Sequence, residues 1–283
     1  MAMTIRLAKR LADAAAPIEP AADAVQSAVR AVPQPVRDLL DGVWLGNPLH
    51  PALTDVPVGA WTAAFLLDLL GADEAADAAL AVGVAGAVPA ALTGLNDWSH
   101  LKGETKRLGI VHALLNSGAL VLNLGSLALR RGGARGPGRV LSAAGFALAS
   151  FSAHLGGELS FGYGVRVNRT AWEEPRDRYL AVLDESDLEG GKLCKADLEG
   201  VAVLVARSER TGEVCAIANT CTHLGGPLDE GTRDGDSVVC PWHGSRFDLC
   251  SGDVEGGPAV YPEPRFEARV RAGKVEVRAA RGE

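Results

Sequence analysis

The chain has few aromatic residues and no excess of positive charge, and each shortage narrows its possible function. Only 5% of its 283 residues are aromatic although 47% are hydrophobic, so the apolar content is mainly Ala, Leu and Val. The net charge of −7 gives no electrostatic reason to expect a nucleic-acid partner. The length suggests about two domains.

The N-terminal segment, residues 1–45, lacks the continuous apolar run of a secretory signal. Its first residues are basic, and acidic residues interrupt the Ala-rich stretches that follow. The pattern predicts one or two short amphipathic helices at a membrane surface. A flexible N-terminal arm is the alternative.

Cysteine is also scarce. Three of the five cysteines, Cys194, Cys215 and Cys250, show no paired spacing, so we do not expect a disulfide framework. They are expected to be small buried or half-buried apolar side chains. This fits a reducing compartment for the C-terminal half of the chain.

Four apolar segments occur in the first half of the chain, separated by short polar loops. The third and fourth have about twenty residues, enough for a helix to cross a hydrocarbon core of about 30 Å. The prediction of a membrane span is weaker for the first segment, which has Asp68 near its end, and for the second, which contains Pro89, when each is taken alone. Together the four predict an all-α transmembrane bundle at residues 46–165, built on Val56–Leu70, Ala78–Leu95, Ile110–Leu129 and Val140–Leu159.

The distribution of Lys and Arg predicts the orientation of this bundle. These residues are more numerous in the segments that share a side with the N-terminus than in the loops on the other side. The chain is therefore predicted to be a multi-pass protein of a bacterial inner membrane, with both termini cytoplasmic. The opposing observation is a cluster between the third and fourth segments, formed by Arg130, Arg131, Arg135 and Arg139.

Four histidines lie where alternating helix directions bring the segment ends to one membrane face: His50, His100, His112 and His154. Asp97 belongs to the same layer. Ionisable residues at this depth usually face the interior of a bundle. His112 and His154 are the deepest and are candidate axial ligands of a haem b, or ligands of another metal or substrate. The alternative is that these histidines hydrogen-bond helix ends or lie at the lipid headgroups.

The second half of the chain contains two pairs of possible metal ligands, Cys221 with His223 and Cys240 with His243. Two thiolates and two imidazoles from separate loops suit a [2Fe–2S] cluster in which two Cys hold one iron and two His hold the other. Zinc is the competing metal, because two Cys and two His also form a common tetrahedral zinc set. Zinc fingers, however, usually pair Cys with Cys and His with His along the chain.

These residues resemble the Rieske iron–sulfur family, and the resemblance covers Trp172–Val277. It implies a small all-β antiparallel sandwich at residues 166–283, with the cluster held by two loops and covered by a third, Gly256–Ala259. Short runs between glycine-containing turns agree with such a domain. They are Val201–Ala206, Val214–Ala218, Val238–Val239, Ala268–Val270 and Lys274–Val277.

The resemblance also predicts how the cluster is tuned. High-potential Rieske proteins carry an extra Cys in each ligand loop, and Gly226 and Trp242 stand at those positions here. Ser245 is retained and is expected to donate to a bridging sulfide, whereas Phe247 replaces a Tyr that would donate a second hydrogen bond. Because hydrogen bonds to cluster sulfurs raise the potential, we expect a value in the lower part of the Rieske range of about −150 to +300 mV.

The first half resembles an uncharacterised four-span bacterial membrane domain family, some members of which are fused to Rieske domains. The motifs that carry this resemblance are Asn47–Pro51, Asn96–Trp98 and Gly156–Glu158. It implies a two-part architecture in a lipid bilayer and supplies no activity.

A Rieske cluster moves one electron and makes no bonds. The forty residues after His243 contain no further His, so we do not expect a complete oxygenase with a mononuclear iron. The chain also lacks a dinucleotide fingerprint, so a reductase would be a separate protein. We predict a membrane-anchored, ferredoxin-like electron carrier with a separate reductase or oxygenase partner. A quinol- or haem-linked membrane redox protein and a redox or iron sensor are the alternatives.

Overall fold

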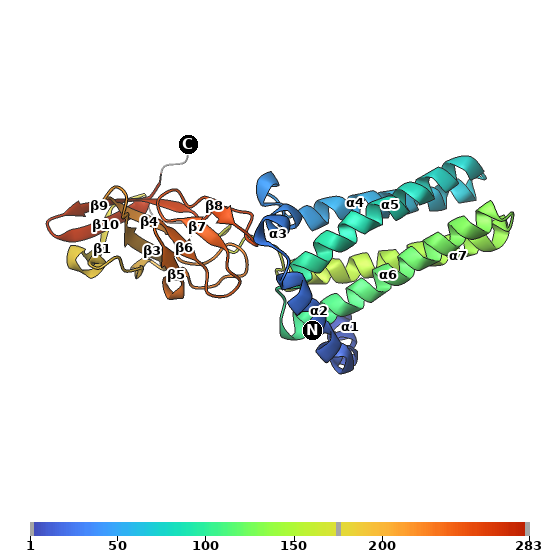
Figure 1. Cartoon of the computed structure of the whole chain (residues 1–283), viewed down its shortest axis with the longest axis horizontal. Coiled ribbons are helices and arrows are strands. Elements are labelled where there is room, and N and C mark those ends of the chain that lie inside the picture. Colours follow the sequence, from blue (N-terminus) through green and yellow to red (C-terminus); the bar gives the residue numbers. More distant parts are fainter. Residues whose placement is uncertain (1–2, 174–176, 281–283) are drawn as a thin grey trace. The chain divides into compact units, whose positions relative to one another are not determined.

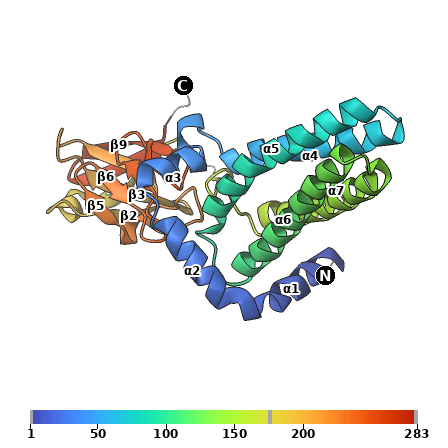
Figure 2. The same ribbon diagram turned by 45° about the vertical axis from the view of Figure 1, so that its right-hand side comes forward.

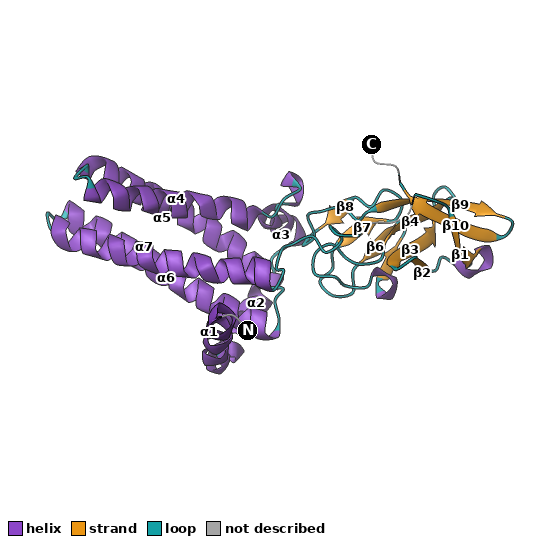
Figure 3. Cartoon of the chain, turned by 180° about the vertical axis from the view of Figure 1, so that it is seen from behind, coloured by secondary structure: helices purple, strands orange, loops and turns teal. Residues whose placement is uncertain are grey.

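The computed structural model describes residues 3–173 and 177–280 and divides into two compact units. The first contains Met1–Pro33 and Pro48–Val165, and the second contains Gln34–Asn47 and Arg166–Glu283. The first is helical and the second holds the strands (Figure 3). The predicted order of a helical part followed by a β part is confirmed.

Four long helices form most of the first unit, and each is long and apolar enough to cross a membrane. All four begin before the predicted apolar segments, and α5 and α6 also end after them, because hydropathy marks only the apolar part of a helix and not its ends. The helices are α4 (Leu49–Leu69), α5 (Asp73–Trp98), α6 (Gly103–Arg131) and α7 (Arg135–Gly157), with a π-helical turn at Glu158–Gly162.

The four helices form two hairpins, α4 with α5 and α6 with α7 (Figure 1). In each hairpin a glycine of the second helix leaves room for a large side chain of the first helix. A Cβ on Gly83 would lie 2.3 Å from Nε1 of Trp61, and one on Gly145 would lie 2.8 Å from Nδ2 of Asn123. Such close approach at small residues is typical of helices that pack within lipid.

A network of ion pairs joins the two hairpins at the end where each hairpin turns. Arg130 is buried and donates to Asp68 and Asp77 at 2.8 Å each. Arg135 donates to Asp77 at 2.6 Å, and Arg139 bonds Asp73. Three of the four arginines that opposed the predicted orientation therefore have a structural role in the bundle.

The N-terminal helices α1 (Met3–Ala14) and α2 (Glu19–Arg30), joined by a 3₁₀ turn at Ala16–Ile18, pack on this unit (Figure 2). Ala8 and Ala12 of α1 are buried in a cluster with Leu108 and Leu155. In α2, Gln26 donates to the carbonyls of Trp98 and Leu101 at 2.9 and 3.1 Å. The amphipathic helices are present, and their buried faces contact the ends of the long helices.

Two antiparallel sheets form the second unit. The larger has the order β1-β10-β9-β4-β3-β2 and the smaller the order β5-β6-β7-β8. All five predicted strand segments lie within observed strands. The strands are β1 (Leu180–Asp184), β2 (Cys194–Leu198), β3 (Val201–Arg207), β4 (Val214–Ala218), β5 (Thr232–Asp234), β6 (Ser237–Val239), β7 (Arg246–Asp248), β8 (Val254–Gly256), β9 (Arg265–Arg271) and β10 (Lys274–Ala279).

Residues 34–47, which precede the long helices in sequence, belong to this β unit. They form α3 (Gln34–Asp41) and a 3₁₀ turn at Val43–Leu45. Asp38 accepts the backbone N–H of Gly257 at 2.8 Å, and Gln34 donates to the carbonyl of the same residue at 3.1 Å. The predicted N-terminal interfacial segment covers residues 1–45. Its last part, from residue 34, instead belongs to the β unit, because α3 packs on a loop of that unit.

Cys215 and Cys250 form a disulfide, so the expectation of no disulfide is wrong. Their Cα atoms lie 4.7 Å apart although 35 residues separate them in sequence. Cys215 lies in β4 and Cys250 in the turn after β7, and packing of the two sheets brings them together. No sequence spacing encodes such a tertiary contact. Cys194 is a free, half-buried thiol.

Candidate metal centre

Two loops of the β unit carry the four expected ligands, and the same pair of hydrogen bonds closes both. In the first loop the N–H of Cys221 donates to the carbonyl of Gly226 at 2.8 Å, and the N–H of Gly225 donates back to Cys221 at 2.8 Å. In the second loop Cys240 donates to the carbonyl of Ser245 at 2.8 Å, and Gly244 donates back at 3.1 Å.

A glycine at positive φ makes each of these turns possible. Gly225 has a φ of 82° and Gly244 a φ of 80°, values that strain any residue with a side chain. The second loop connects β6 to β7, whose register pairs Val238 with Phe247. The two loops are thus built alike, and each presents one Cys and one His.

The two thiols meet inside the unit, where both cysteines are buried. A hydrogen bond with Cys240, together with burial, raises the pKa of the Cys221 thiol. The same hydrogen bond lowers the pKa of Cys240 to about 7, and the backbone N–H groups of Trp242 and His243 act in the same direction. Backbone donors directed at a sulfur stabilise a thiolate, which is the form that binds metal.

The two imidazoles also meet. The ring centroids of His223 and His243 lie 5.2 Å apart with their planes perpendicular. Two imidazole nitrogens bound at about 2.0–2.1 Å to one tetrahedral ion place the ring centroids about 5 Å apart. The residues therefore pair as Cys with Cys and His with His in space, although each loop supplies one of each. This pairing fits a binuclear cluster with two Cys on one iron and two His on the other.

The third loop covers the ligand loops as expected. It contains a cis peptide bond between Gly257 and Pro258, and the N–H of Ala259 donates to Oγ of Ser245 at 3.0 Å. Because the Ser245 oxygen accepts this bond, its own hydroxyl hydrogen stays available for another acceptor. That is the arrangement expected of a donor to a bridging sulfide.

The side chains around the ligands differ in exposure. Phe247 is fully buried beside the ligand loops, in a cluster that includes both cysteines. His223 is buried and His243 is half-buried. Trp242 is 51% exposed and stands edge-on to His243, with ring centroids 6.3 Å apart.

A buried carboxyl that the sequence did not single out supports the first ligand loop. Glu263 is 2% exposed and accepts the N–H of Thr222 at 2.8 Å. The Thr222 hydroxyl donates to the carbonyl of Tyr261 at 2.9 Å. Burial raises the pKa of Glu263 well above its ordinary value. The residue between Cys221 and His223 is therefore held from both its backbone and its side chain.

Comparison with known proteins identifies the β unit. A family described as the Rieske [2Fe-2S] domain matches residues 178–269. "Ferredoxin CarAc" of Metapseudomonas resinovorans is 37% identical over 100 residues, which is 35% of this chain and 92% of that protein. The chain belongs to the Rieske [2Fe–2S] family. This membership implies a [2Fe–2S] cluster as the cofactor.

Two further proteins are similar to the Rieske domain of this chain. "Apoptosis-inducing factor 3" of Homo sapiens is 35% identical over 101 residues, but the match spans only 16% of that protein and 36% of this chain. The solved "Complex of reduced oxygenase and oxidized ferredoxin in carbazole 1,9a-dioxygenase" is 33% identical, with a TM-score of 0.35, over 38% of this chain and all of the matched chain.

The helical unit matches a second family, described as "Predicted membrane protein (DUF2231)", over residues 46–169. The predicted fusion of a Rieske domain to a four-span membrane domain is confirmed.

The structure brings together only some of the residues predicted to form a membrane site. His50 and His112 are neighbours, with ring centroids 6.5 Å apart. Asp97 and His100 are buried, whereas His154 is exposed on the surface of α7. The partner of His112 is therefore His50 and not His154, because α7 turns His154 outward.

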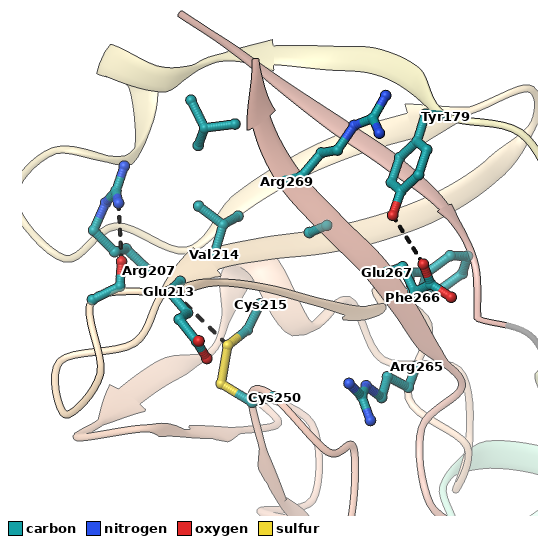
Figure 4. A pocket seen from close by; sticks show the side chains of 13 residues that line it. Tyr179, Arg207, Glu213, Val214, Cys215, Cys250, Arg265, Phe266, Glu267 and Arg269 are labelled. Carbon is teal, nitrogen blue, oxygen red and sulfur yellow. Dashed lines mark hydrogen bonds between the residues drawn. A yellow bond between two sulfur atoms is a disulfide. The ribbon is translucent and has the colours of Figure 1, made fainter.

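A shallow hollow of about 480 Å³ lies elsewhere on the Rieske domain, beside the disulfide (Figure 4). β4 and β9 form most of its wall, with Cys215 and Cys250 at one side. Tyr179 donates to Glu267 at 2.9 Å, and the Arg269 guanidinium lies 3.7 Å from the centre of the Tyr179 ring. None of the four cluster ligands lines this hollow.

Proposed function

We propose that this protein is a membrane-anchored Rieske electron carrier that exchanges single electrons with a separate redox partner. The observation that carries the proposal is the spatial pairing of Cys221 with Cys240 and of His223 with His243. A [2Fe–2S] cluster bound by that donor set would accept one electron at a time and would activate no substrate. The similarity to nearly the whole of a bacterial ferredoxin supports the same role.

The anchor is the four-helix unit, whose helices are long and apolar enough to cross a bilayer. Its surface carries large apolar side chains that water would not favour, as a lipid-facing surface requires. Examples are Leu70, Val121 and Val140, at 80%, 66% and 69% exposed. Anchoring would keep the cluster near a membrane, where it meets only partners that reach that surface.

The partner we propose is a separate reductase, oxygenase or other redox protein. Trp242 and His243 offer the route for electrons, because His243 is the more exposed of the two candidate His ligands and the ring of Trp242 beside it is 51% exposed. The decisive experiment uses the full-length protein in detergent with the cluster reduced stepwise. We expect a Rieske electron-resonance signal, a potential in the lower half of the range, and one-electron reduction by a flavin-dependent ferredoxin reductase. A potential high enough for quinol oxidation would favour the quinol-linked alternative instead.

We further propose that the membrane is the bacterial inner membrane and that the Rieske domain lies in the cytoplasm. Lys and Arg counts support this orientation, and three of the opposing arginines have a structural role in the ion-pair network. The disulfide between Cys215 and Cys250 points the other way, because disulfides persist in oxidising compartments. A fluorescent protein fused after residue 283 should fluoresce in cells. An active alkaline phosphatase fusion at the same site would reverse the orientation.

A further inference from the structure

The two helical hairpins are repeats of each other, offset by 62 residues. The offset relates His50 to His112, Trp61 to Asn123 and Gly83 to Gly145. In each hairpin the side chain at the second of these positions lies against the glycine at the third. Four helices in which the second pair repeats the first have a pseudo-twofold axis between the pairs, as in membrane proteins built from parallel repeats.

The ion pairs between the hairpins obey the same offset with their charges exchanged. Each acidic residue of the network has an arginine at the equivalent place in the second repeat. The equivalent pairs are Asp68 with Arg130, Asp73 with Arg135 and Asp77 with Arg139. The offset is thus seen in packing and in charge, which are independent of the histidines.

His50 and His112 are equivalent under this repeat, and their environments match. Nδ1 of His50 lies 2.9 Å from the carbonyl oxygen of Ala90, and Nδ1 of His112 lies 2.9 Å from that of Ser152. Both partners are 40 residues further along the chain. Such a repeated contact shows that the ring orientation is built into both hairpins.

Each ring also lies against a glycine of the returning helix. A Cβ on Gly94 would lie 2.6 Å from Cε1 of His50, and a Cβ on Gly156 would lie 3.2 Å from Cε1 of His112. These two glycines are again equivalent under the offset of 62 residues. The hairpins therefore leave the space that each imidazole needs.

These contacts fix which nitrogen is available for a metal. A carbonyl oxygen only accepts, so Nδ1 of each ring carries the hydrogen and Nε2 carries the lone pair. An imidazole that donates Nδ1–H to a backbone carbonyl is the usual form of a metal-bound histidine. In this structure the Nε2 of His112 accepts from the Asn116 amide at 3.0 Å, a contact that a metal would replace.

The ring separation indicates how a metal would be held. The centroids of His50 and His112 lie 6.5 Å apart, with the planes at 89°. Two imidazole nitrogens bound at about 2.0–2.1 Å on opposite sides of one ion place the centroids about 6.4 Å apart. The separation matches opposed ligands, in contrast to the 5.2 Å of the cluster histidines.

We propose that His50 and His112 are the two opposed ligands of a transition-metal centre on the axis of the repeat. Among the described residues, no group of three or more His, Cys, Asp or Glu side chains is placed to hold a metal ion. The centre must therefore bring its other ligands with it. Haem iron is the class of centre that fits, because it takes four ligands from its porphyrin and two from the protein. A free metal ion is the other source of the same chemistry. The inference concerns the anchor of the proposed electron carrier.

The test uses the full-length protein purified from haem-sufficient cells, with spectra, haem content and metal content measured on one sample. We expect a Soret band and about one haem per chain in the wild type and in the matched control His154→Ala, whose histidine is exposed near the end of α7. His50→Ala and His112→Ala should each lose the haem and keep the electron-resonance signal of the cluster. His112→Met, which keeps a haem ligand, should shift the bands rather than abolish them.

The remaining outcomes are equally distinct. A metal beyond the two cluster irons, without haem bands but lost in both Ala variants, would support the site with a free ion as occupant. A wild type with neither haem nor an additional metal overturns the inference, as does haem that persists in both Ala variants. Absence of the cluster signal would instead count against the proposed function, so the two failures are separate.

Discussion

The indole of Trp242 lies directly against the backbone of Gly226. A Cβ at position 226 would fall 3.1 Å from Cγ of the indole and 2.8 Å from Sγ of Cys240. In high-potential members of the family these two positions are joined by a disulfide. Here the Trp242 ring packs against the backbone of Gly226 at these positions, so the two ligand loops are in contact without a covalent bond.

Gly226→Ala should therefore impair cluster binding. The added methyl group would contact the sulfur that binds iron, and the sulfur belongs to a buried loop that cannot move freely. We expect fewer than two irons per chain and a weakened electron-resonance signal. The matched control is Gly256→Ala, whose Cβ would meet only Cβ of Arg246 at 3.6 Å. A fully loaded Gly226→Ala cluster with unchanged spectra would contradict this account of the loop contact.

Phe247→Tyr should raise the cluster potential, and Ser245→Ala should lower it. A hydrogen bond to a charged group contributes about 1.5–3 kcal/mol, which for one electron corresponds to about 60–130 mV. Phe247 is fully buried in the same cluster as both cysteines, so a hydroxyl added to its ring would lie near the iron–sulfur cluster. Potentials from redox titration of both variants provide the check.

Phe266→Tyr is the control for the potential, because Phe266 is buried in the other core of the Rieske domain. It should leave the potential unchanged. If Phe247→Tyr left the potential where it was or lowered it, the missing hydrogen bond would not explain the low value that we expect.

The disulfide between Cys215 and Cys250 should stabilise the Rieske domain. Closing a loop of 35 residues removes about 3–4 kcal/mol of conformational entropy from the unfolded chain. Cys250→Ser should lower the free energy of unfolding by about that amount, measured by denaturant titration without reductant. Cys194→Ser, which changes a free thiol, should have little effect. Equal stability of Cys250→Ser and wild type would show that the bond does not form.

The exchanged charges of the two repeats predict a rescue. Asp68→Arg or Arg130→Asp alone leaves a buried like-charge pair and should cost about 3–5 kcal/mol or more. The double variant, which exchanges the two residues, should recover part of this loss because each position then holds the residue of its repeat equivalent. Thermal unfolding in detergent measures the difference, and Arg131→Gln, at an exposed neighbour, is the control. A double variant less stable than both single variants would argue against the repeat.

The four candidate cluster ligands could be predicted from the sequence because their signal is local. Each loop holds its Cys and His within four residues, and a glycine two residues or fewer after each His permits the turn. The four long apolar helices were equally visible, since a run of apolar residues is a property of one segment. Both predictions used information carried by neighbouring residues.

The remaining features depend on contacts between distant residues. Asp38 bonds Gly257 across 219 positions, and no local pattern in α3 indicates that contact. His154 was paired with His112 because both are deep in their segments, but depth does not tell which way a helix faces. The offset of 62 residues was the signal that would have paired His112 with His50 instead.

The contacts of residues 34–47 have a consequence for how the protein is made. Arg166 donates to the carbonyls of Asp41 and Pro258 at 2.7 Å each, so it bonds one residue translated before the four long helices and one translated after them. The ribosome makes α3 before the four long helices and the loop at Gly257 after them. Assembly of the iron site would therefore be complete only after all four of these helices have been synthesised. A fragment that begins at residue 166 would lack the helix that holds this loop.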